Sequence, residues 1–96
     1  MSQKVITLDL TNCKHIMEFH QRIKKAFDFP DFYGENWDAF WDLLRSECDA
    51  DKVVILGEHA MPKEFNVELE KMHEILQQTV EDRKKHGFHF EFEIIS

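Results

Sequence analysis

The feature that most constrains the fold is a short, continuous apolar segment in the middle of the chain, Val53–Leu56, which is closed by Gly57. Such a segment is typical of a strand that is buried on both faces, and strands of that kind usually belong to parallel sheets. Because parallel strands are joined by long crossover connections, we expect helices on both sides of it. No apolar run in the chain is longer, and a membrane-spanning helix needs roughly 20 apolar residues, so none is expected.

Alternating patterns at the two ends of the chain predict two further strands. Apolar residues alternate with polar ones from Ile6 to Leu10. They alternate again from Phe88 to Ile94, which is the clearest strand pattern in the sequence. The N-terminal segment enters the first pattern directly, without the basic and apolar regions of an export signal, so the cytoplasm is the expected compartment.

The first helix is predicted from apolar-face residues that recur at spacings of three and four, namely Ile16, Phe19, His20, Ile23 and Phe27. Thr11 and Asn12 offer N-cap oxygens before it, and Pro30 marks its end. His20 lies on the apolar stripe of this helix, and we assign it to the core rather than to a ligand site.

Two more helices follow. Asn36 is the expected N-cap of a helix over about Trp37–Ser46, after a turn in which Gly34 can take a positive φ. After a loop with a short helical turn behind Pro62, Asn66 is the expected cap of a long helix that ends before Gly87. The 96 residues therefore predict one α/β domain, residues 1–96, with a three-stranded parallel sheet, three main helices and a short helical turn.

The net charge of −7 argues against nucleic acid and anionic membranes as partners, because phosphate binding needs a basic surface. Most of the excess lies in residues 31–51, where Arg45 is the one basic residue. The acidic residues of this stretch are Asp31, Glu35, Asp38, Asp42, Glu47, Asp49 and Asp51. The stretch could be a solvated face that aids solubility, or a surface for a cationic partner.

Helical spacing separates the side chains of the second helix into two groups. The apolar group consists of Trp37, Phe40, Leu43 and Leu44, and the charged group of Asp38, Asp42 and Arg45. Trp41 falls at the seam between them, and Phe32 and Tyr33 precede the helix. Rings beside carboxylates suit a protein-binding surface. The alternative is that Trp41 is a core residue and Asp38 only favours the helix N-terminus.

The sequence gives little support for a catalytic site or a metal site. Asp38 and Asp42 would lie on one exposed helix without a pocket or an opposing face. The Cys13/His15 and His86/His89 pairs have no zinc-ligand spacing, and the two cysteines are expected to remain thiols. With three glycines and no phosphate-binding loop, the sequence predicts no enzyme, no cofactor and no metal; a small metal-dependent hydrolase would have to carry stoichiometric metal.

The segment from Pro30 to Leu44, PDFYGENWDAFWDLL, resembles the barstar family, the intracellular inhibitors of barnase-type secreted ribonucleases. The resemblance extends through FHQRIKKAF, Phe19 to Phe27, and the order of elements agrees over the whole chain. It implies a monomer that binds a ribonuclease toxin 1:1, as an immunity protein. Electrostatically steered association and a charged hot spot are established for the barnase–barstar pair. The resemblance implies them for this chain, and the sequence itself does not predict them.

The resemblance also implies roles for individual residues. Asp42 would enter the nuclease active site in place of substrate phosphate, Asp38 would be a second inhibitory carboxylate, and Tyr33 would cover the catalytic histidine. The acid on the last helix would be Asp82 or Glu81. The full expected partner-binding set is Phe32, Tyr33, Gly34, Asn36, Asp38, Trp41, Asp42, Ser46 and Asp82.

Some positions depart from the family pattern. Phe32 replaces a tyrosine, and Arg45 and Ser46 stand where barstar has a small polar residue and a glycine. A cation near a cationic active site should be repelled, so either Arg45 points away or the partner differs from barnase. The alternative function is a barstar-like module that binds a non-ribonuclease toxin or a regulatory protein.

Overall fold

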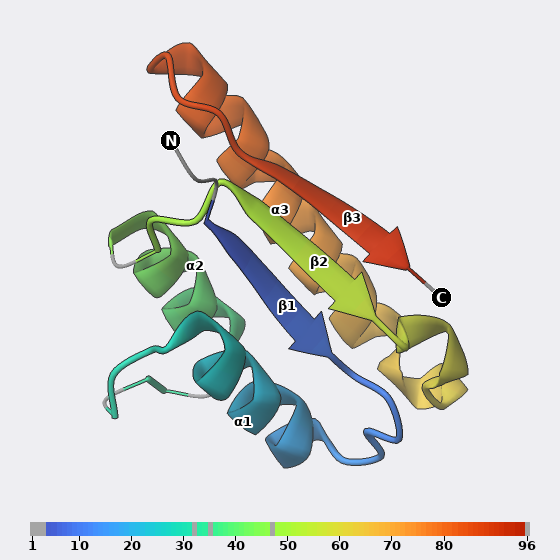
Figure 1. The fold of residues 1–96 in the computed structure, drawn as a ribbon. Coiled ribbons are helices and arrows are strands. Elements are labelled where there is room, and N and C mark those ends of the chain that lie inside the picture. The colour runs from blue at the N-terminus through green and yellow to red at the C-terminus, as the bar shows by residue number, and fades with distance from the viewer. Residues whose placement is uncertain (1–3, 32, 35, 47, 96) are drawn as a thin grey trace.

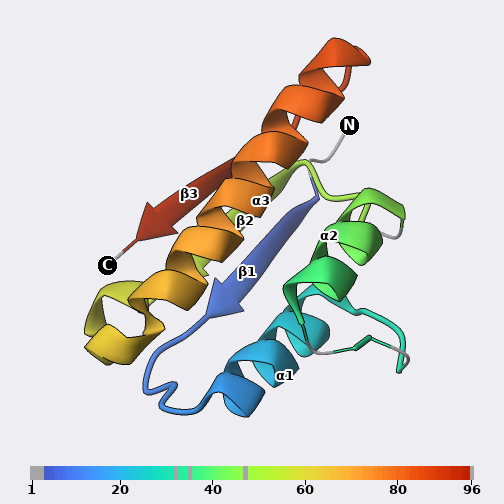
Figure 2. The same cartoon turned by 180° about the vertical axis from the view of Figure 1, so that it is seen from behind.

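The computed structural model describes residues 4–31, 33, 34, 36–46 and 48–95. The elements, in chain order, are β1 (Val5–Asp9), α1 (Ile16–Phe27), α2 (Trp37–Ser46), β2 (Lys52–Leu56), the 3₁₀ turns η1 (Glu58–Ala60) and η2 (Lys63–Phe65), α3 (Asn66–Lys85) and β3 (Glu91–Ile95). Figure 1 shows the sheet in front of α3, with α1 and α2 on the side of β1, and Figure 2 shows the same arrangement from behind. No helix in the described part of the chain has the length and apolar character to cross a membrane.

The sheet has the order β1-β2-β3, and both pairs of strands are parallel. Ile6 is in register with Val53, and Val53 with Phe92. The crossover from β1 to β2 contains α1 and α2, and the crossover from β2 to β3 contains α3. The predicted α/β architecture is therefore confirmed, including the helical turn after Pro62.

The prediction that β2 is buried on both faces is wrong. Val53 and Ile55 are buried, but Val54 and Leu56 are only half-buried, because the helices cover one face of the sheet. On the open face, Lys52 Nζ lies 3.0 Å from a carboxylate oxygen of Glu93. A central strand is flanked by neighbours on both edges, so it can hold apolar residues on a face that no helix covers.

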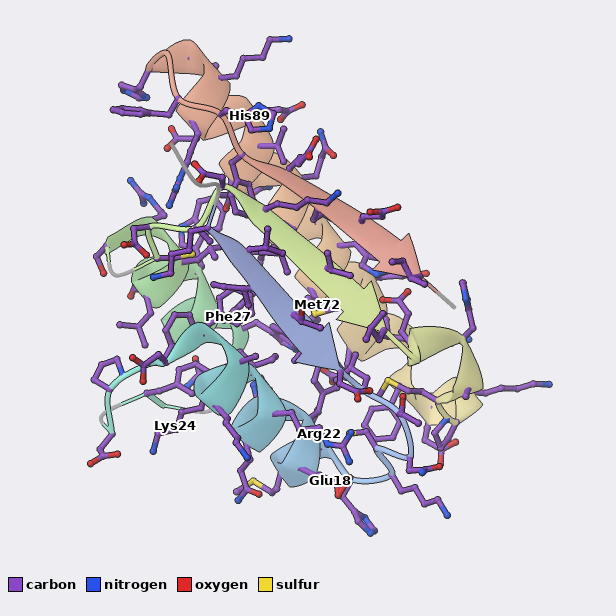
Figure 3. All side chains as sticks on the ribbon, viewed as in Figure 1. Glu18, Arg22, Lys24, Phe27, Met72 and His89 are labelled. Carbon is purple, nitrogen blue, oxygen red and sulfur yellow. The ribbon has the colours of Figure 1, made fainter. Side chains whose placement is uncertain are left out.

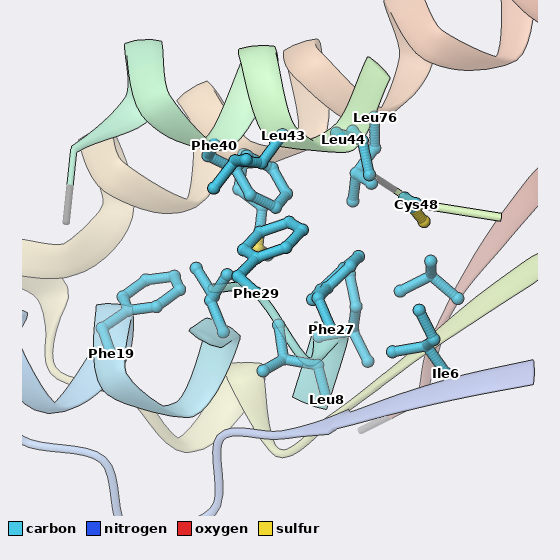
Figure 4. Close-up of a cluster of buried hydrophobic side chains, with 14 of the residues drawn as sticks. Ile6, Leu8, Phe19, Phe27, Phe29, Phe40, Leu43, Leu44, Cys48 and Leu76 are labelled. Carbon is cyan, nitrogen blue, oxygen red and sulfur yellow. The ribbon is translucent and has the colours of Figure 1, made fainter. Parts of the chain in front are cut away.

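The core lies between the helices and the sheet (Figure 4). The rings of Phe27, Phe29 and Phe40 form its aromatic centre: Phe27 stacks on Phe29 at 5.2 Å between centroids and meets Phe40 edge-on at 5.5 Å. Cys13 and Cys48 are buried free thiols, as predicted, and burial raises the pKa of both.

The first helix begins later than its predicted caps. Its N-cap is His15, which makes no side-chain cap hydrogen bond, and Asn12 has a φ of 62° in the preceding turn. Asp9 Oδ1 instead accepts a hydrogen bond from Thr11 N at 2.9 Å, which draws this segment into a turn after β1. The prediction that Thr11 or Asn12 caps the helix is therefore wrong.

The turn after β1 is also fixed from α1. Arg22 donates hydrogen bonds to the carbonyl oxygens of Thr11 at 2.6 Å and Asp9 at 3.1 Å. Its guanidinium lies 3.5 Å from Glu18, one helical turn away, and Figure 3 shows the two side chains together near the start of α1. At the other end, α1 stops at Asp28, whose left-handed φ of 56° ends the helix before Pro30 is reached.

The last strand is shorter than predicted. β3 begins at Glu91, whose register partner is Lys52, and Phe88 is 68% exposed outside the sheet. Gly87 ends α3 with a φ of 79°, as predicted, and the chain needs the next three residues to reach the sheet. The alternating pattern in the sequence therefore begins before the segment that pairs in the sheet. Phe90, although it lies outside β3, is buried.

The two asparagines predicted as caps behave differently. Asn36 Oδ1 accepts a hydrogen bond from Ala39 N at 2.8 Å, which is the expected N-cap of α2. Asn66 is itself the first residue of α3; the cap position is Phe65, and no side chain caps that helix.

This contrast yields a prediction with an internal control. Replacing Asn36 by alanine should lower the free energy of unfolding by about 1 kcal/mol, because one helix N–H loses its acceptor. The matched Asn66→Ala variant should change it by less than about 0.5 kcal/mol. Urea denaturation of both variants measures the difference, and equal losses would contradict the assignment of the cap.

Candidate functional site

The start of α2 is held against both other helices by Trp37. The indole Nε1 of Trp37 donates a hydrogen bond to Glu68 on α3. Its ring meets Phe19 of α1 edge-on, with centroids 5.5 Å apart and planes at 83°. Such aromatic edge contacts and a satisfied N–H are the usual way in which a tryptophan joins elements. The first turn of α2 is thus fixed in orientation.

The end of α2 is held by Arg83, which projects from the last turn of α3. Its guanidinium donates to the carbonyl oxygens of Cys48 at 2.7 Å and of Leu44 at 3.2 Å, and it lies 5.2 Å from the ring centre of Phe90. The carbonyls at a helix end have no partner within the helix, so an arginine is well suited to satisfy them. Sequence reasoning missed this residue, because a basic residue there is expected merely to favour the C-terminus of its own helix.

The two acids of α2 face solvent. Asp38 and Asp42 are exposed, and within the described ranges no ion pair or hydrogen bond is made by either carboxylate. Their spacing of four residues places them one turn apart on the same face. Other acids of the same stretch are paired: Asp31 lies 3.1 Å from Lys24, and Asp49 pairs with Lys4, which holds the pKa of the Asp49 carboxyl below its usual range.

A hollow of about 500 Å³ lies beside Asp42, between α2 and α3. It is lined by Asp42, Arg45, Ser46 and Asp82. Of the two candidate acids on α3, Asp82 is therefore the one that shares a hollow with Asp42. Trp41 is half-buried at the seam, as predicted, and the Arg45 guanidinium lies 5.5 Å from its ring centre.

Tyr33 lies in the core, where sequence reasoning did not place it. Only 5% of its surface is exposed, and its hydroxyl is 2.7 Å from Nδ1 of His20. His20 is itself buried, so its assignment to the core is confirmed. The Tyr33 ring in this position supports the turn before α2 from within the core. Phe32, the neighbouring aromatic residue, lies outside the described residues.

Gly34 is exposed at the start of the site, but it does not take the positive φ that was predicted. A side chain there would meet a different obstacle: a Cβ would lie 3.0 Å from Nδ2 of Asn36. The Asn36 amide also donates to the Gly34 carbonyl at 3.0 Å, so the glycine and the helix cap form one unit.

The structure thus divides the predicted partner-binding residues. Asp38, Trp41, Asp42, Ser46 and Asp82 lie on or beside the outer side of α2; we call this set the acidic face. Gly34 and Asn36 lie at the start of the helix, and Tyr33 lies beneath it. Among the residues that the structure describes, no group of three or more His, Cys, Asp or Glu is placed to hold a metal ion.

The three-stranded fold and the exposed acids of α2 match the class expected from the sequence, and comparison with known proteins agrees. The model of the Barstar family, described as barnase inhibitor, matches residues 3–94. A protein of Bacillus subtilis (strain 168) named "Putative ribonuclease inhibitor YrdF" is 31% identical over 91 residues, which are 94% of each chain. The chain belongs to the Barstar family, whose members are inhibitors and not enzymes.

The role of Arg83 can be tested by its removal. Arg83→Ala should lower the free energy of unfolding by about 2 kcal/mol, because carbonyls at the end of α2 lose a charged donor. Lys84→Ala removes the same charge from an exposed neighbour and should cost less than about 0.5 kcal/mol. Chemical denaturation compares the two, and similar losses would show that Arg83 does not hold α2.

Proposed function

We propose that this protein binds a ribonuclease toxin 1:1 and blocks the active site of that enzyme with the acidic face. The observation that carries the proposal is the state of Asp38 and Asp42: both carboxylates are exposed, and neither has a cationic partner in the described part of the chain. They are available to cations of another molecule.

The chemistry of the target explains why such a face inhibits. A ribonuclease gathers cationic side chains to bind a phosphodiester and to stabilise the charge that develops on it. Carboxylates can satisfy the same cations through charge-assisted hydrogen bonds, yet they offer no bond to cleave. Inhibition is therefore competitive, and Asp42, beside the hollow, is the proposed anchor.

The way α2 is held favours tight binding. Trp37 fixes its first turn and Arg83 fixes its end, so the two carboxylates are presented on a rigid element. A surface that is already ordered loses little conformational entropy on association. The half-buried ring of Trp41 provides apolar contact next to the charges.

The remaining residues have supporting roles in the proposal. Asp82 contributes a third carboxylate from α3, and Ser46 lies in the same hollow. Gly34 and Asn36 set the start of the helix, while Tyr33 positions the preceding turn through its contact with His20. The net charge of −7 steers the chain toward a basic enzyme, so association should slow as salt is added. The proposed setting is the cytoplasm of the cell that makes the toxin.

A second candidate function is that of a barstar-like module with a partner other than a ribonuclease. The observation that favours it is Arg45, a cation within the hollow that Asp42 lines. The adjacent reading frame in the genome distinguishes the two functions. If it encodes a basic, secreted nuclease domain, the ribonuclease-inhibitor function is supported. If it does not, the function with another partner is supported.

Asp42→Ala should weaken inhibition of the target ribonuclease at least about 30-fold, equivalent to roughly 2 kcal/mol, the threshold for a hot-spot residue. The control is Glu64→Gln, which removes one charge from an exposed acid on η2 and should change inhibition less than about 3-fold. Steady-state inhibition assays at fixed salt make the comparison. Inhibition by Asp42→Ala within a factor of two of the unchanged chain would refute the anchor role.

A further inference from the structure

Arg45 is a cation on an acidic surface. All ten residues of α2 are described, and Arg45 is the one basic residue among them. Its side chain is exposed, with the guanidinium 5.5 Å from the ring centre of Trp41. The attraction between a guanidinium and an aromatic face gives it a preferred position without neutralising its charge.

Arg45 also stands at the centre of the hollowed surface between α2 and α3. Three hollows there share Arg45 and Asp82. The first also contains Asp42, the second contains Trp41, and the third extends to the exposed ring of Phe88. A partner that received Asp42 in its active site would therefore also cover Arg45.

Covering Arg45 has an energetic consequence. No ion pair and no hydrogen bond of its guanidinium occurs among the residues that the structure describes, although Asp42 and Asp82 line the same hollow. A guanidinium carries five N–H donors, and removing them from water without acceptors is strongly unfavourable. A complex over this hollow is disfavoured unless the covered guanidinium gains hydrogen-bond acceptors, and a carboxylate is the strongest of these because it also balances the charge.

We propose that Arg45 determines which ribonuclease this protein inhibits, by requiring a carboxylate on the partner next to the cationic pocket that receives Asp42. This inference rests on the proposed function. A carboxylate can accept two parallel hydrogen bonds from a guanidinium, which strengthens the binding of an enzyme that has a carboxylate at that place. An enzyme with a cation at that place is rejected by like-charge repulsion, so one residue supplies both attraction and discrimination.

The test uses the ribonuclease that the unchanged chain inhibits most tightly among barnase and the secreted ribonucleases of its own organism. Arg45→Gln keeps a long side chain over Trp41 but removes the charge, and it should weaken inhibition at least 10-fold. Arg45→Glu should weaken it at least 100-fold. Lys84→Ala, an exposed cation that lines none of the three hollows, is the control and should change inhibition less than 3-fold.

Equal or tighter inhibition by Arg45→Gln would overturn the inference, since Arg45 would then be repelled by the partner or paired within its own chain. Asp42→Ala in the same series separates this failure from that of the proposed function. If Asp42→Ala loses inhibition while Arg45→Gln keeps it, only the role of Arg45 is wrong. If Asp42→Ala also keeps it, the acidic face is not the inhibitory surface. Circular dichroism shows that each variant is folded.

Discussion

Burial of one side of α2 is the interaction on which the rest of the structure depends. Phe40 and Leu44 are completely buried against the core, and Leu43 is nearly so. Because a helix turns by about 100° per residue, this burial forces Asp38 and Asp42 outward. The contacts of Trp37 and Arg83 then fix the helix at both ends. The outward position of Asp38 and Asp42 is thus a direct consequence of core packing, and neither carboxylate pairs with a cation in the described part of the chain.

Two unpaired carboxylates one turn apart repel each other, and such pairs destabilise a helix by a few tenths of a kcal/mol. Among the residues that the structure describes, lysines pair with Asp31 and Asp49, whereas these two acids have no such partner. Local rules of stability are commonly broken at functional sites, where the cost is balanced by the rest of the fold. In the proposed function, the cations of the nuclease relieve this repulsion.

Local patterns predicted the elements and the exposed acids well. Alternation placed β1, helical spacing placed α2, and the Asn36 cap was correct, because each depends on residues close in sequence. Contacts between distant residues were not predictable: Arg83 acts 35 residues away on Cys48, and Tyr33 enters the core through His20. Packing against the sheet had to be known before either contact could be placed.

The same limit explains the errors. Asn66 has the chemistry of a cap, but the 3₁₀ turn before it already continues into α3. The apolar run of β2 does not reveal that helices cover only one face, and the alternation through Phe88 does not reveal where pairing begins. Pattern describes what an element could bury, whereas the tertiary arrangement decides what it does bury.

The most direct measurement is the affinity of this protein for its ribonuclease in the presence of a nucleoside 3′-monophosphate, which fills the phosphate site of the enzyme. If the carboxylates of α2 occupy that site, the apparent Kd should rise in proportion to the nucleotide concentration once the enzyme is saturated. An apparent Kd that stays constant under saturating nucleotide would contradict the account, because inhibitor and phosphate would then bind at separate places.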